Sequence, residues 1–187
     1  MTNFIDLGSD TATRPSAGMR AFMAQAPVGD EQRQEDPSVN ALQERVAALL
    51  AKEAALYLPS ATMANAIAVK VHTRPTDEVI LERTAHIATS ETGGTAVLSG
   101  ATFCPIDGVR GVFTEQQVVD AIRADDPHCP RTRLVCVEQT ANRSSGHTVP
   151  PDVLCVFSIA STEARGVQNS PSFHPAPRIC AGVRRPR

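Results

Sequence analysis

The sequence has 187 residues and a formal net charge of −2; 42% of the residues are hydrophobic and 20% are charged. This composition excludes a wholly disordered chain, and the near-neutral charge gives no reason to expect a nucleic-acid partner. No apolar run is long enough for a membrane span, and the first residues lack the features of a secretory signal. The five cysteines and five histidines show no metal-ligand spacing, so we expect free thiols, no metal and a cytoplasmic protein.

Apolar periodicity and cap residues predict alternating helices and strands. In chain order these are a helix opened by Asp36-Pro37 and running to Leu50, a strand at 54–58, a helix at 60–71, a strand at 78–81, a helix capped by Thr114 and a strand at 133–137. The glycine-rich stretch 93–100 is compatible with turns or with short strands. This alternation predicts an α/β fold with a mainly parallel sheet and flanking helices on both faces.

Charge divides the chain near residue 154. Residues 1–154 have a net charge of −6, whereas residues 155–187 have a net charge of +4, four prolines and no apolar periodicity. We therefore expect a folded domain over residues 1–154 and an irregular, disordered basic tail over residues 155–187.

The junction at residues 58–65 is a candidate anion site. The sequence predicts a strand followed at once by a helix, and a helix N-terminus offers free backbone N–H groups and a favourable dipole. The hydroxyls of Ser60 and Thr62 would add donors there, although an ordinary serine N-cap with no ligand explains the same pattern. Neither GxxxxGK[ST] nor GxGxxG is present, which excludes a Walker loop and a dinucleotide fingerprint.

Three titratable residues follow predicted strands. His86 comes just after the strand at 78–81, Glu91 lies shortly beyond it, and Glu138 ends the strand at 133–137. Sites in parallel α/β sheets lie beyond the carboxyl ends of strands, so these side chains are candidates for chemistry. A packed or surface imidazole, and carboxylates that face solvent, are the alternatives. The polar segment 6–15 is either a plain loop or the wall of a polar pocket.

Several collinear segments resemble the threonine aldolases of the aromatic amino-acid β-eliminating lyase group, which are fold-type-I pyridoxal-phosphate enzymes. The resemblance covers residues 3–154, roughly the front half of such an enzyme. It rests on DLGSDTATRPS (6–16), APVGDEQRQEDPSVNALQE (26–44), KEAALYLPSATMANAIAVKVH (52–72), DEVI (77–80), TAHI…ETGGTAVLSG (84–100) and RTRLVCVEQTANR (131–143).

This resemblance implies roles for individual residues. Ala61 and Thr62 would bind the phosphate of pyridoxal 5'-phosphate, His86 would stack on its ring as a catalytic residue, and Ser9 would hold the substrate carboxylate. The family's reaction is retro-aldol cleavage of threonine or allo-threonine to glycine and acetaldehyde, with the cofactor as electron sink. The implied fold is an incomplete fold-type-I large domain, and the implied assembly is a homo-oligomer with a small amino acid as substrate.

The sequence also departs from the family pattern. Arg33 and Gln34 stand where the family has Tyr-Gly, and Ala141 stands where an active-site histidine is expected. Ala61 replaces a glycine of the phosphate site, which requires a negative φ at this position.

Two catalytic segments of the family have no counterpart after Leu154. These are the Asp-Gly-Ala-Arg strand and the Ser-Lys-Gly segment that carries the Schiff-base lysine. The chain's two lysines, Lys52 and Lys70, match non-catalytic helix positions. We therefore expect a truncated lyase that is inactive alone and holds no covalently attached cofactor, with residues 155–187 arising from a shifted reading frame. A purpose-built basic tail, a non-catalytic phosphate-binding or oligomerisation fragment, and an unstable product are the alternatives.

Overall fold

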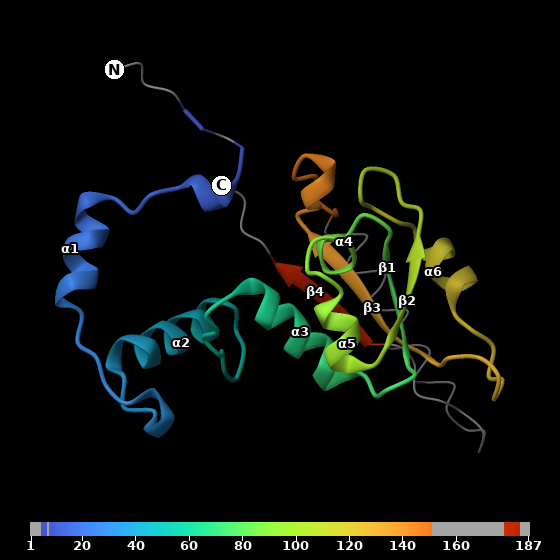
Figure 1. The fold of residues 1–187 in the computed structure, drawn as a ribbon, viewed down its shortest axis with the longest axis horizontal. Coiled ribbons are helices and arrows are strands. Elements are labelled where there is room, and N and C mark those ends of the chain that lie inside the picture. The colour runs from blue at the N-terminus through green and yellow to red at the C-terminus, as the bar shows by residue number, and fades with distance from the viewer. Residues whose placement is uncertain (1–4, 7, 151–177, 184–187) are drawn as a thin grey trace. The chain divides into compact units, whose positions relative to one another are not determined.

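The computed structural model describes residues 5–6, 8–150 and 178–183 (Figure 1). The chain divides into two compact units, of which the first ends at Tyr57 and the second begins at Leu58. The first unit contains two α-helices among its described residues, α1 (Ala17–Gln25) and α2 (Pro37–Leu49), and 3-10 turns at Asp10–Ala12 and Glu31–Arg33. Each unit is described separately below.

Helix α2 begins where its cap residues predict. The Asp36 carboxylate accepts hydrogen bonds from the backbone N–H groups of Ser38 (2.9 Å) and Val39 (3.0 Å), and Pro37 occupies the first helical position. These contacts satisfy donors that have no partner inside the helix. The predicted helix is therefore confirmed, although it ends at Leu49 and Leu50 is its C-cap.

The strand predicted at 54–58 is wrong. These residues form neither a helix nor a strand, and the side chains of Leu56 and Tyr57 are exposed. The Tyr57 N–H donates to Gln43 Oε1 (2.8 Å) in place of a neighbouring strand. A short apolar run has a strand's composition, but it becomes a strand only when another backbone lies beside it to pair with it.

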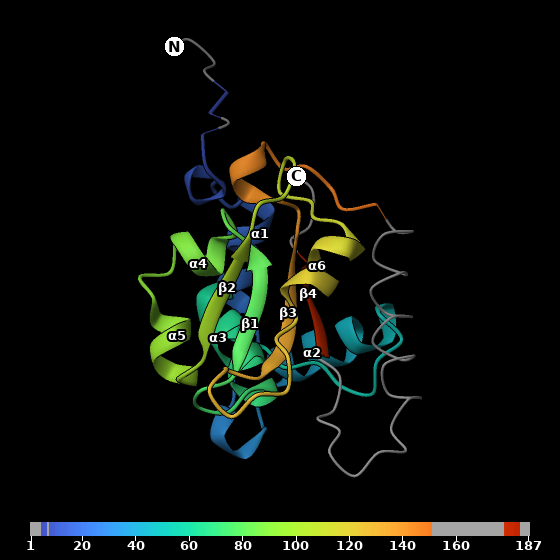
Figure 2. The ribbon, with the colours of Figure 1, turned by 90° about the vertical axis from the view of Figure 1, so that its right-hand side faces the viewer.

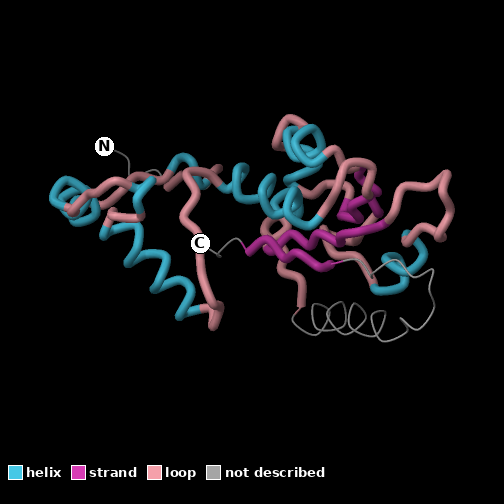
Figure 3. Tube along the Cα trace, turned by 90° about the horizontal axis from the view of Figure 1, so that it is seen from below, coloured by secondary structure: helices cyan, strands magenta, loops and turns pink. Residues whose placement is uncertain are grey.

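The second unit is built on a four-stranded parallel sheet in the order β2-β1-β3-β4. Figure 3 shows the strands of this sheet in magenta and the helices in cyan. The central strand β1 is buried along its length and β3 is buried or half-buried, which agrees with the apolar middle of each strand. The bounds of the strands are β1 Glu78–Glu82, β2 Thr102–Ile106, β3 Thr132–Gln139 and β4 Arg178–Val183.

Helices cover both faces of this sheet, as predicted. Alternate residues of β1 face opposite sides: Ile80 packs with Val118 of α6, whereas Val79 and Leu81 pack with Val69 of α3. Figure 2 shows α6 and the α4–α5 pair on opposite sides of the strands. The bounds of the helices are α3 Ala61–His72, α4 His86–Thr89, α5 Gly94–Ser99 and α6 Glu115–Ala121.

The segment expected to be an irregular tail contributes a strand. Residues 178–183 form β4 and pair in parallel with β3, so the expectation of an irregular tail does not hold for these six residues. Their sequence, RICAGV, is a short, mostly apolar run, which is compatible with a strand even without alternation. The other residues beyond 150, including the predicted boundary at 154, lie outside the described part of the chain.

Candidate functional site at the carboxyl edge of the sheet

The strand order marks one place on the sheet as the candidate site. Strand β1 is followed in the chain by β2 on one side of it, whereas β3 and β4 lie on the other side. The carboxyl ends of β1 and β3 therefore flank a topological switch point, where parallel α/β sheets bind their ligands. Helix α4 follows β1 at this edge, and a 3-10 turn, Asn142–Ser144, follows β3.

The start of α3 has the features of an anion site. Ser60 is its N-cap, and the Ser60 hydroxyl oxygen accepts from the Met63 N–H (3.1 Å). Ala61 is the first helical residue and has a negative φ, so the condition for replacing a glycine here is met. Backbone N–H groups in the first turn of a helix have no partner within the helix. Ala61 and Thr62 are both exposed and carry such groups.

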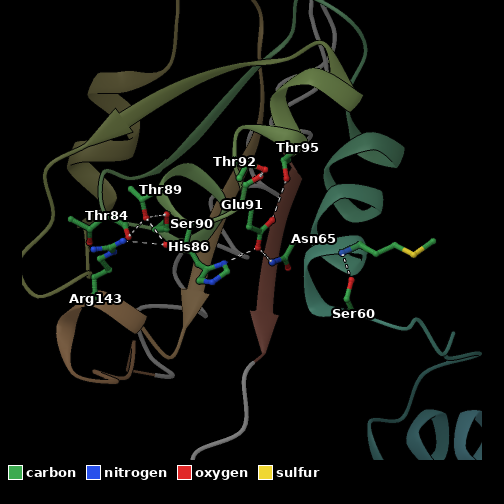
Figure 4. Close-up of polar contacts among 12 residues, drawn as sticks. Ser60, Asn65, Thr84, His86, Thr89, Ser90, Glu91, Thr92, Thr95 and Arg143 are labelled. Carbon is green, nitrogen blue, oxygen red and sulfur yellow. Dashed lines mark hydrogen bonds and ion pairs between the residues drawn. The ribbon is translucent and has the colours of Figure 1, made fainter. Parts of the chain in front are cut away.

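His86 is held by a buried carboxylate. Its Nδ1 atom lies 2.7 Å from Glu91 Oε1, and the Glu91 side chain is 0% exposed while the imidazole is 19% exposed. Asn65 Nδ2 of α3 donates to the same Glu91 oxygen (2.7 Å), and the Thr95 hydroxyl of α5 donates to Oε2 (3.4 Å). Figure 4 shows Glu91 between the imidazole and Asn65, so three helices converge on one carboxylate.

A second contact joins the two sides of the switch point. Arg143, in the turn after β3, donates from Nη2 to the Ser90 hydroxyl at the end of α4 (3.4 Å; Figure 4). Nearby, Arg83 donates to both carboxylate oxygens of Asp107. This hydrogen bond, more than the charge itself, lowers the pKa of Asp107. The edge therefore carries the guanidinium groups of Arg83 and Arg143.

The structure does not bring all predicted site residues together. Ser9 lies in the first unit, where its hydroxyl is 2.8 Å from the Thr11 hydroxyl in a local turn, and its role stays a prediction. Glu138 lies near the carboxyl end of β3, as predicted. Ala141, at the position of the expected histidine, is buried (2% exposed).

Asn65 is the site residue that sequence reasoning missed. It lies three residues after Thr62, and residues spaced by three share one face of a helix. This spacing was a usable signal within the junction 58–65. Its partner Glu91 is 26 residues further on, and no local pattern predicts that contact.

Within the described residues, no helix combines the length and apolar character needed to cross a membrane. No cluster of His, Cys, Asp or Glu in that part of the chain is arranged to hold a metal ion, and Cys104, Cys129 and Cys136 are free thiols.

The family model for the beta-eliminating lyases matches residues 6–165. The chain belongs to this family. The low specificity L-threonine aldolase of Escherichia coli K12 is 43% identical over 151 residues, which are 80% of this chain and 44% of that protein. The probable low-specificity L-threonine aldolase 2 of Arabidopsis thaliana is 37% identical over 151 residues, 78% of this chain and 42% of that protein.

Solved structures of this family share the fold. The threonine aldolase of Leishmania major has a TM-score of 0.62 at 22% identity, over 69% of this chain and 38% of that chain. A putative aromatic amino acid beta-eliminating lyase/threonine aldolase from Exiguobacterium sp. also has a TM-score of 0.62, at 18% identity, over 80% of this chain and 42% of that chain. The predicted family and fold class are confirmed. This chain spans less than half the length of the curated relatives described here.

Proposed function

We propose that this chain provides the phosphate-binding and ring-binding part of a threonine-aldolase-like lyase that uses pyridoxal 5'-phosphate. The family depends on this cofactor, and its threonine aldolases act on small amino acids. The observation that carries the proposal is the bridge from Asn65 through Glu91 to His86. This bridge ties the N-terminal half of α3, with its free N–H groups, to the imidazole at the end of β1.

The residues at this edge fit the cofactor's phosphate and ring. The backbone N–H groups of Ala61 and Thr62 would donate to the phosphate, whose charge the α3 dipole favours, and the Thr62 hydroxyl would add a donor. The face of the His86 imidazole would pack against the pyridine ring. When bound, pyridoxal phosphate supplies the electron sink for carbanion formation. The chain's own residues hold and orient it.

The 187 residues by themselves are proposed to lack lyase activity. Retro-aldol cleavage of threonine or allo-threonine in this family uses a Schiff-base lysine, and the chain has only Lys52 and Lys70. Lys70 is exposed in the last turn of α3, eight residues after Thr62 and therefore about 12 Å further along the helix axis. Lys52 is exposed in the first unit. We therefore expect no covalent attachment of the cofactor.

Cofactor binding is tested by titrating the full 187-residue chain with pyridoxal phosphate, with ³¹P NMR and fluorescence as the two measures of binding. We expect saturable binding that Thr62→Val weakens about tenfold, the scale of a lost hydrogen bond to a charged group. Thr102→Val is the matched control, because Thr102 is exposed at the opposite, amino end of the sheet. Equal affinity of both variants, or no binding by the wild type, contradicts the proposal. Binding of inorganic phosphate in place of the cofactor would favour a general phosphate-binding module.

Activity is tested separately. Borohydride reduction of the chain with pyridoxal phosphate should leave its mass unchanged, and allo-threonine should release no acetaldehyde. A mass increase that disappears in the Lys52→Arg, Lys70→Arg double variant would overturn the expected inactivity.

We also retain the proposal that residues 155–187 come from a shifted reading frame, and that the folded protein is a cytoplasmic homo-oligomer. Translation of the coding DNA after codon 154 in the other two frames tests the first part. An Asp-Gly-Ala-Arg segment followed by a Ser-Lys-Gly segment in either frame would support it, and their absence from both would contradict it. Light scattering of the purified chain tests oligomerisation.

A further inference from the structure

A buried carboxylate at the carboxyl edge is in hydrogen-bond contact with three helices. We call Glu91, His86, Asn65 and Thr95 the Glu91 cluster. The partners of Glu91 come from α3, α4 and α5, and the Glu91 side chain has no solvent exposure. Burying a carboxylate is costly unless its oxygens are hydrogen-bonded, so this arrangement has a strict geometry.

The donors fix the proton on the imidazole. Asn65 donates to Oε1 and Thr95 donates to Oε2, so both oxygens act as acceptors, as those of an ionised carboxylate do. An ionised carboxylate can only accept, so we assign His86 Nδ1, at 2.7 Å from Oε1, as the N–H donor in its contact with Glu91. In the neutral ring the proton on Nδ1 leaves Nε2 as an acceptor.

We propose that Glu91, oriented by Asn65, is a positioning residue that fixes the tautomer and the ring plane of His86. The inference rests on the proposed function, because the ring that Glu91 orients is the one proposed to pack on the cofactor. Because Nδ1 of His86 is hydrogen-bonded to the buried Glu91, the ring face and the Nε2 lone pair of His86 remain for a ligand.

Asn65 gives this arrangement a second purpose. It lies on the helix whose first turn carries Ala61 and Thr62, so its bond to Glu91 joins the phosphate-binding N–H groups to the imidazole through one carboxylate. A shift of either helix would break a 2.7 Å contact on the same oxygen. The cluster therefore sets the spacing between the two proposed contact points of the ligand.

The test is ¹H–¹⁵N NMR of the histidine rings in the full chain at pH 8.5, without cofactor, about two units above the ordinary histidine pKa. His86→Gln assigns the His86 signals. We expect Nδ1 to carry the proton in the wild type. Glu91→Leu should convert His86 to the Nε2–H tautomer that water favours. Glu91→Gln retains an acceptor oxygen that Asn65 can hold and should rescue the Nδ1–H form.

Further measurements distinguish a loss of His86 positioning from unfolding of the variant and from a change in cofactor binding. The ring signals of the other histidines, His72 and His128 among them, report whether Glu91→Leu remains folded, and Glu91→Gln keeps the volume. The Asn65→Leu variant should convert a smaller fraction of His86 than Glu91→Leu does. An Nε2–H tautomer in the wild type, or one that is unchanged in a folded Glu91→Leu variant, overturns the inference.

Pyridoxal phosphate affinity is then compared between wild type, Glu91→Leu and Glu91→Gln. We expect Glu91→Leu to weaken binding about tenfold, the scale of one hydrogen bond to a charged group, and Glu91→Gln to restore most of it. If the tautomer responds but the wild type binds no cofactor, the proposed function fails while the assignment of Glu91 stands. If the wild type binds and Glu91→Leu binds equally well, the positioning role fails and the proposed function survives.

Discussion

The two ends of strand β1 carry buried glutamates that are held in different ways. Glu78, at the amino end, is 2% exposed and accepts from both Arg123 Nε and Nη2 (3.2 Å each to its nearer oxygen) and from the Thr132 hydroxyl. Next to it, Asp77 accepts from Arg131 Nε (3.1 Å) and Nη2 (2.8 Å). Both carboxylates at this end are therefore neutralised by guanidinium groups.

At the carboxyl end the donors are of another kind. Glu82 is 6% exposed, and its Oε2 accepts from the N–H and the hydroxyl of Thr84, both at 2.6 Å. Glu91 accepts from an amide and a hydroxyl, and its Oε1 lies 2.7 Å from an imidazole nitrogen. An arginine stays charged at every relevant pH, whereas an imidazole changes its protonation near neutrality. The amino end thus holds its buried carboxylates with permanent positive charges, whereas the carboxyl end holds them with neutral or titratable groups.

The largest effect that this comparison predicts is at Arg131. We expect Arg131→Met to lower the free energy of unfolding by about 2 kcal/mol, because it leaves Asp77 buried without its cation. The value is below that for a fully buried pair because the Arg131 side chain is 30% exposed. Urea denaturation measures the change. Arg83→Met, which breaks the exposed pair with Asp107, is the control and should cost less. Equal losses of unfolding free energy in Arg131→Met and Arg83→Met would contradict the proposed difference between the amino and carboxyl ends of β1.

A smaller effect is expected at the other end of β1. Glu82→Gln should cost about 1 kcal/mol or less, because the glutamine oxygen still accepts both bonds from Thr84. Glu78→Gln, the matched change at the amino end, should cost more, because it removes the charge that pairs with Arg123. The same urea titrations compare the two. A larger loss for Glu82→Gln than for Glu78→Gln would contradict the proposed difference.

Features set by neighbouring residues were the ones that the sequence predicted. Asp36 and Ser60 cap their helices through N–H groups two or three residues away, so the cap residue alone indicates where each helix starts. Thr114 and Gln117 form a reciprocal capping box over the same short distance. The position of His86 followed from the end of a predicted strand, and the structure places it there.

Features that depend on distant partners were not predictable. The bond between Asn65 and Glu91 joins residues 26 apart, and it exists because α3 packs against α5, which follows Glu91 in the chain. The strand expected at 54–58 has no neighbouring strand, whereas Arg178–Val183 becomes one because β3 offers a free edge. Pairing, and not composition, decided both outcomes.

Asp36 shows how neutral hydrogen-bond donors change the pKa of a carboxylate when burial is not the main influence on that pKa. It too is held by neutral donors, but in the first unit and without desolvation as the main influence. The backbone N–H groups of Val39 and then Gly29 hold the pKa of Asp36 below its usual range. A lowered folded-state pKa stabilises α2 above the ordinary aspartate range, and this contribution is lost as pH falls below about 4 through the folded value.

The matched variant is Asp36→Asn, because asparagine caps a helix equally well but does not titrate. Circular dichroism at 222 nm should show that wild type loses more helix than the variant between pH 5 and pH 2. Parallel pH profiles for the two proteins would show that the carboxylate contributes nothing.

The smallest effect is a change in thiol reactivity near the amino end of the sheet. Burial raises the pKa of the Cys104 thiol, the charge of Glu78 raises it further, and Arg123 opposes them. Arg123→Gln should therefore raise the pKa again, so that Cys104 reacts more slowly with a disulfide reagent at pH 8. The measurement uses a background in which Cys104 is the remaining cysteine, with rates recorded across pH. An electrostatic effect moves the midpoint of the profile upward and leaves the plateau rate unchanged, and Arg83→Gln at the other end should move neither. A higher plateau in Arg123→Gln would instead mean that the guanidinium acts by covering the thiol, and the amino end would then owe its stability to packing more than to charge.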